Sequence, residues 1–141
     1  MSKFSKVFDF SKEKNANKVY AALENGRGRD LLNSFLSEAQ MPTAQDYEKA
    51  QLTITNSYIC SYQEFKRQLF IIPLEDIVNV YMSNSFYGSY NYEFRAIAVE
   101  TRHNETFYFA RHSRAQRPEV VRAAYAELVN RCKANEGSLI A

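Results

Sequence analysis

The chain has 141 residues, of which 45% are hydrophobic and 24% are charged. This composition is ordinary for one globular domain and argues against a disordered, collagen-like or disulfide-rich chain. The chain has 18 lysines and arginines against 16 aspartates and glutamates, so its net charge is only +2. Dedicated DNA binding requires a more basic surface, and we therefore expect no nucleic-acid partner.

Neither a membrane span nor a secretion signal is predicted. The strongest apolar run, 69–72, ends at Pro73, far short of the roughly 20 apolar residues that cross a bilayer. No apolar stretch typical of a signal peptide follows Met1. Cys60 and Cys132 are too far apart for a metal or redox motif and are predicted to be buried thiols. We expect a cytoplasmic protein without a metal or cofactor.

Residues 11–40 are predicted to form a helical hairpin. Ser11 is the expected N-cap of the first helix, and Gly26 and Gly28 are expected to end it. Pro42 lies just past the end of the second helix. The apolar faces, which we expect to pack on the chain's own domain, comprise Ala16, Val19, Tyr20 and Leu23 in the first helix and Leu31, Leu32, Phe35, Leu36 and Ala39 in the second.

Six strands and a final helix are predicted after the hairpin. Alternating apolar residues place the strands at 50–55, 58–62, 66–72, 77–84, 92–101 and 105–110. The short gaps between them favour antiparallel pairing. At the corner after Pro73, Leu74 and Ile77 are expected in the core, and Glu75 and Asp76 in water. An amphipathic helix follows at 118–134, with Gly137 beyond its end. This order predicts an α+β fold.

Three segments of the strand region resemble a known family. They read LTITNSYI at 52–59, IPLEDIVNV at 72–80, and AIAVET at 96–101 followed by TFYF at 106–109. Together they resemble the bacterial pleckstrin-homology-like (PH-like) and GRAM-like domains. The resemblance implies a partly open antiparallel β-barrel of six to seven strands in two near-orthogonal sheets, capped by the C-terminal helix. A seventh strand would come from the segment before Ala50 or from the N-terminus, or be absent.

The domain boundaries follow from this resemblance. We expect an N-terminal helical extension at 1–43, a PH-like domain at 44–136 and a tail at 137–141. The resemblance carries no ligand over to this chain. The first hairpin loop, where eukaryotic relatives hold phosphoinositides, would be 56–57, and it has no basic residue.

The segment 83–92 is the strongest candidate for a binding surface. It mixes Tyr, Ser, Asn and Gly without a single charge, a composition typical of binding loops. We predict protein binding through Phe86, Tyr87, Tyr90 and Tyr92. The alternatives are that these rings fold back onto the domain or support a dimer.

A second candidate surface is basic. Arg102, Arg111, Arg114 and Arg117 are candidates for binding an anion or a lipid headgroup, and the alternative is a solvated loop. Phe4, Val7, Phe8 and Phe10 alternate with lysines and either lie on a membrane or dock on the domain, which we favour. His103 and His112 have no acidic neighbour at a motif spacing and are predicted to be ordinary surface residues.

These patterns favour a non-enzymatic binding module without catalytic residues. The expected partner is a protein or peptide, bound by the 83–92 hairpin and the open sheet edge beside it. The alternative is peripheral binding to an anionic membrane through the basic loop and the N-terminus. An enzyme around the two histidines is the weakest hypothesis, and homo-oligomerisation stays open.

Overall fold

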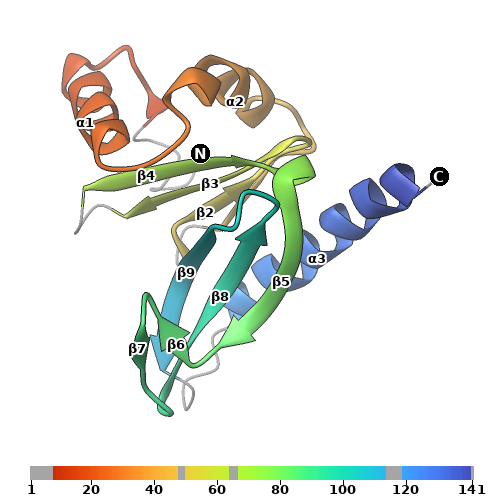
Figure 1. Ribbon diagram of the computed structural model, residues 1–141. Coiled ribbons are helices and arrows are strands. Elements are labelled where there is room, and N and C mark those ends of the chain that lie inside the picture. Colours follow the sequence, from red (N-terminus) through yellow and green to blue (C-terminus); the bar gives the residue numbers. More distant parts are fainter. Residues whose placement is uncertain (1–7, 48–49, 64–66, 114–118, 141) are drawn as a thin grey trace. The chain divides into compact units, whose positions relative to one another are not determined.

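The computed structural model describes residues 8–47, 50–63, 67–113 and 119–140 (Figure 1). It has an α+β fold with three α-helices and antiparallel sheets. Residue contacts group the chain into two compact units, Met1–Pro73 and Leu74–Ala141. The domain boundary expected between 43 and 44 therefore lies inside the first unit.

The predicted helical hairpin is present in the first unit. It consists of α1 (Glu13–Glu24), a short 3-10 helix η2 (Arg29–Leu31) and α2 (Leu32–Ala39). The prediction of Ser11 as N-cap is wrong, because Lys12 occupies that position without a side-chain cap. The Ser11 hydroxyl instead donates a hydrogen bond of 2.6 Å to Asp9 Oδ1. Tyr20, expected on the apolar face, is 49% exposed.

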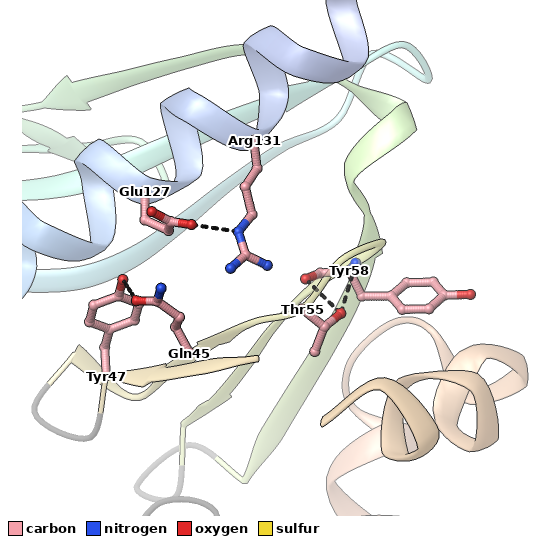
Figure 2. Close-up of polar contacts among 6 residues, drawn as sticks. All are labelled: Gln45, Tyr47, Thr55, Tyr58, Glu127 and Arg131. Carbon is pink, nitrogen blue, oxygen red and sulfur yellow. Dashed lines mark hydrogen bonds and ion pairs between the residues drawn. The ribbon is translucent and has the colours of Figure 1, made fainter. Parts of the chain in front are cut away.

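The first sheet has four antiparallel strands in sequence order. They are β1 (Gln45–Tyr47), β2 (Leu52–Ile54), β3 (Tyr58–Gln63) and β4 (Gln68–Pro73). Strand β1 lies in the segment before Ala50, one of the expected sources of a further strand. Figure 2 shows two of the contacts that shape this sheet. The Tyr47 hydroxyl donates to Gln45 Oε1, and the Thr55 hydroxyl both donates to and accepts from the backbone of Tyr58.

The helical hairpin packs on this sheet, as its apolar faces predict. One buried cluster combines Val19, Ala22, Leu23, Leu32 and Phe35 of the helices with Cys60, Tyr62, Leu69 and Ile71 of β3 and β4. Burial, followed by the charge of Asp46, raises the pKa of the Cys60 thiol well above its usual range. Phe8 meets Phe35 edge-on at 5.3 Å, so the described end of the N-terminal segment docks on the hairpin. Phe4 and Val7 lie outside the described residues.

The connection between α1 and α2 covers the outer edge of β4. Arg27 pairs with Phe70 in a parallel bridge, donating its amide to the Leu69 carbonyl at 3.0 Å and accepting from the Ile71 amide at 2.8 Å. The backbone approaches so closely that a Cβ on Gly26 would lie 1.8 Å from the Leu69 oxygen. Gly26 therefore has a packing role in addition to the predicted helix stop.

This close approach predicts a large cost for Gly26→Ala. The added methyl group meets strand backbone, which cannot move without breaking the β4 ladder, so the free energy of unfolding should fall by at least about 2 kcal/mol. Gly88→Ala is the control, because no atom lies within 4 Å there and only its positive φ of 85° is strained, a cost of about 1 kcal/mol. Urea denaturation measures both, and a Gly26→Ala loss no larger than the control's would contradict this packing.

The second unit contains another antiparallel sheet and a long helix. Its strands are β5 (Ile77–Ser83), β8 (Phe94–Thr101) and β9 (Thr106–Ser113), in the order β5-β8-β9. A separate two-stranded hairpin, β6 (Ser85–Phe86) and β7 (Ser89–Tyr90), lies within the 83–92 segment. The 3-10 helix η4 (Leu74–Asp76) precedes β5. The antiparallel pairing is as predicted, whereas β9 continues three residues beyond the predicted end at Ala110.

Helix α3 (Glu119–Ile140) ends the second unit. It packs against η4 and β5 within that unit. The buried side chains of its apolar face are Val121, Ala124 and Leu128, as expected of an amphipathic helix. The helix continues through Gly137 to Ile140, so the prediction that it ends before Gly137 is wrong. Within this helix, Arg131 and Glu127 lie one turn apart and form an ion pair, with 2.7 Å between Arg131 Nε and Glu127 Oε1 (Figure 2).

Candidate functional site

The candidate site centres on the β6–β7 hairpin, defined here as residues 83–92. Phe86 pairs with Ser89, so Tyr87 and Gly88 form the two-residue turn between the strands. Both have positive φ, 49° for Tyr87 and 85° for Gly88, as in a type I′ turn. Glycine suits this geometry, but a left-handed conformation is costly for a residue as bulky as tyrosine. Tyr87 therefore needs support from its surroundings.

That support comes from strand β9. The ring of Tyr87 lies edge-on to those of Phe86 and Tyr108, with centroids 4.9 Å away in each case. The Tyr87 hydroxyl accepts a hydrogen bond of 3.3 Å from the backbone N–H of Tyr108. The Thr101 amide donates to the Glu105 carbonyl at the start of β9, so alternation along the strand points the Tyr108 N–H away from β8. Among the described residues, β9 is the last strand of its sheet and no further strand pairs with this N–H. Tyr87 thus occupies one donor of an open sheet edge.

The base of the hairpin is fixed by Asn84. Its side-chain amide donates to the carbonyl of Phe94 at 2.9 Å and to that of Tyr92 at 3.4 Å. The backbone carbonyl of Asn84 accepts a hydrogen bond of 2.9 Å from the backbone N–H of Asn91. The two ends of the hairpin are therefore held together and tied to the start of β8, so the aromatic side chains between them have a defined backbone.

The four predicted aromatic residues fall into two roles. Tyr87, Tyr90 and Tyr92 expose 47%, 69% and 63% of their surface. Phe86 is half-buried, with its ring centroid 5.9 Å from that of Tyr108. The tyrosines offer contact area, and Phe86 joins the hairpin to β9.

Arg111 is the one predicted basic residue that the structure places beside this hairpin. Its guanidinium carbon lies 4.4 Å from the centroid of the Phe94 ring and 5.7 Å from that of Phe86. A β-bulge permits this placement, because the β8–β9 register shifts next to Ala110, whose φ is 57°. The extra residue turns Arg111 toward the aromatic side chains, which simple alternation along the strand does not predict.

The predicted arginine cluster is not assembled among the described residues. Arg102 belongs to the β8–β9 turn, at the other end of β9 from Arg111, roughly 15–20 Å along the strand. Its guanidinium pairs with Asp76 Oδ1 at 2.9 Å. Arg114 and Arg117 lie outside the described residues.

The position of Asp76 corrects one prediction. It was expected to face water, yet only 6% of its surface is exposed. It binds Arg102, and its second carboxylate oxygen lies 3.4 Å from Nε2 of His103, which is an exposed residue as predicted. The Arg102 amide also donates to the Asp76 carbonyl at 2.8 Å. This cluster ties η4 to the β8–β9 turn, a structural role that spacing along the sequence does not reveal.

Asp76→Asn should therefore destabilise the chain, whereas Glu75→Gln should not. The first substitution weakens two polar contacts of a buried carboxylate, and the half-exposure of Arg102 limits the expected loss to about 1–2 kcal/mol of unfolding free energy. Glu75 is an exposed neighbour, and its substitution should cost less than about 0.5 kcal/mol. Urea denaturation compares the two, and equal losses would contradict the anchoring role of Asp76.

The remaining observations concern other chemistry. Nδ1 of His112 lies 2.8 Å from the Ala110 carbonyl oxygen, which fixes the ring beside the bulge. In the part of the chain that the structure describes, no group of three or more His, Cys, Asp or Glu residues is arranged to hold a metal ion. No helix there has the length and apolar character of a membrane span.

Comparisons with family models, curated proteins and solved structures found no match.

Proposed function

We propose that the chain is a cytoplasmic, non-enzymatic module that binds an extended peptide segment of a partner protein. The peptide adds a strand to the outer edge of β9 and packs against the tyrosines of the β6–β7 hairpin. The fold that we propose is PH-like. A four-stranded antiparallel sheet, a three-stranded one and a final helix follow one another in the chain, and the resemblance implies two sheets of six to seven strands with a C-terminal helix.

One observation carries this proposal: an exposed aromatic hairpin and an open strand edge form one surface. The backbone N–H of Tyr108 points away from β8, toward the outer edge of the strand, and donates a hydrogen bond to the Tyr87 hydroxyl. Backbone groups on an antiparallel strand alternate in direction, so those of Thr106 point the same way. A peptide strand would place its own carbonyl where Tyr87 now accepts, as in other cases of strand addition.

The hairpin supplies the apolar part of the interface. Tyrosine buries a large area while losing little side-chain entropy, and such residues often dominate binding energy. Tyr90 and Tyr92 are the most exposed of the hairpin rings. Their exposure beside polar, uncharged Ser89 and Asn91 favours contact with a protein segment.

The test uses the full chain and a phage-displayed library of octapeptides. Selected peptides are synthesised and their Kd values measured by fluorescence polarisation. Tyr90→Ala should weaken binding at least about fivefold, because an anchoring ring contributes 1 kcal/mol or more. Tyr20→Ala is the matched control, since this tyrosine is 49% exposed on α1, and it should leave Kd unchanged.

Two results would contradict the proposal. One is that no octapeptide binds, and the other is that Tyr20→Ala weakens binding as much as Tyr90→Ala. Co-sedimentation with vesicles containing anionic lipid is run in parallel. Salt-sensitive vesicle binding that is insensitive to Tyr90→Ala, in a chain that selects no peptide, would favour the membrane alternative instead.

A further inference from the structure

Arg111 gives the proposed binding edge a chemical preference. It projects from β9, the edge strand itself, with its guanidinium group over the Phe94 ring. Stacking on an aromatic ring engages the flat face of a guanidinium and leaves the N–H donors around its rim available. The rings of Phe94 and Phe86 therefore orient a planar set of donors beside the strand edge.

No carboxylate within the described ranges forms an ion pair with these donors. Two other arginines do have such partners, because Arg102 pairs with Asp76 and Arg131 pairs with Glu127. Arg111 is exposed, and its contacts within the described ranges are the two aromatic ones. A stacked, oriented arginine without an acid is suited to bind a carboxylate from outside the chain.

The surroundings of Arg111 also favour an acidic ligand. Arg95 pairs with His112 in the register of β8 and β9, directly beside Arg111. The segments 91–95 and 109–113 contain two arginines, Arg95 and Arg111, and one histidine. Their single acidic residue is Glu93. The hairpin segment 83–92 contributes no charge. This end of the edge is thus mildly basic, while the hairpin beside it is neutral and aromatic.

We propose that the peptide bound at β9 carries an aspartate or glutamate whose carboxylate pairs with Arg111, which makes Arg111 a specificity-determining residue. This inference rests on the proposed function. Arg111 lies three residues beyond Tyr108, which is about 7–10 Å along a bulged strand. The acidic side chain should therefore stand at one fixed position, about three residues from the peptide residue that pairs with Tyr108.

The experiment scans a selected octapeptide with Glu or Gln placed at each position in turn. Full-length protein is titrated by fluorescence polarisation at low and at physiological salt. At one position the Glu peptide should bind at least about fivefold more tightly than its Gln counterpart. Arg111→Gln should abolish this preference, and a cooperative unfolding transition in urea shows that the variant is folded. Arg29 is an exposed arginine in the first unit, so Arg29→Gln is the control and should retain the preference for the Glu peptide.

A second variant tests the stacked geometry. Arg111→Lys keeps the charge but loses the planar donors. The difference in binding free energy between the Glu peptide and the Gln peptide should therefore fall to less than half of its value in the unmodified protein. Equal binding of Glu and Gln peptides at every position, or a preference that survives Arg111→Gln, would overturn the inference while leaving Tyr90-dependent peptide binding intact. Failure of every octapeptide to bind would overturn both proposals together.

Discussion

An exposed strand edge carries backbone donors and acceptors that need partners, and this constraint explains much of the structure. The chain meets it differently in its two units. In the first unit, Arg27 is hydrogen-bonded along β4 between two glycines whose lack of a side chain permits the approach. In the second unit, only one outward amide of β9 has a described partner, and that partner is the side-chain hydroxyl of Tyr87. Backbone pairing closes the first edge, whereas a side-chain hydroxyl covers one donor of the second.

The same constraint accounts for the hairpin beside β9. A tyrosine in the left-handed conformation is unfavourable in isolation, but here its ring packs on Phe86 and Tyr108 while its hydroxyl binds the edge. Burial raises the pKa of the Tyr87 hydroxyl, although the hydrogen bond from the Tyr108 backbone lowers it in part. The hydroxyl therefore remains protonated and neutral at physiological pH. The turn, the edge contact and the exposed rings thus depend on one another, and a change at Tyr87 alters all three.

The sequence predicted elements whose signals are local. Helical spacing identified α1, α2 and α3, and short gaps identified antiparallel pairing. It also singled out 83–92 as a hairpin, because composition and turn residues are local properties, whereas the exposure of its tyrosines was left open. The errors arose where distant residues decide the outcome. Asp76 is buried because Arg102 and His103 reach it from a turn that lies far along the chain. Arg111 joins the aromatic residues because a bulge at Ala110 breaks the strand alternation, and no local signal distinguishes this arginine from Arg102.

Residue-resolved amide hydrogen exchange tests most directly whether the edge of β9 is the binding edge. Tyr87→Phe keeps the ring and removes the hydroxyl, so the Tyr108 amide should exchange several-fold faster while that of Phe109, which faces β8, stays unchanged. Adding a selected octapeptide should then slow exchange at Tyr108 and leave the Ile71 amide, bonded to Arg27, unaffected. An exchange rate at Tyr108 that responds neither to Tyr87→Phe nor to the peptide would contradict the account.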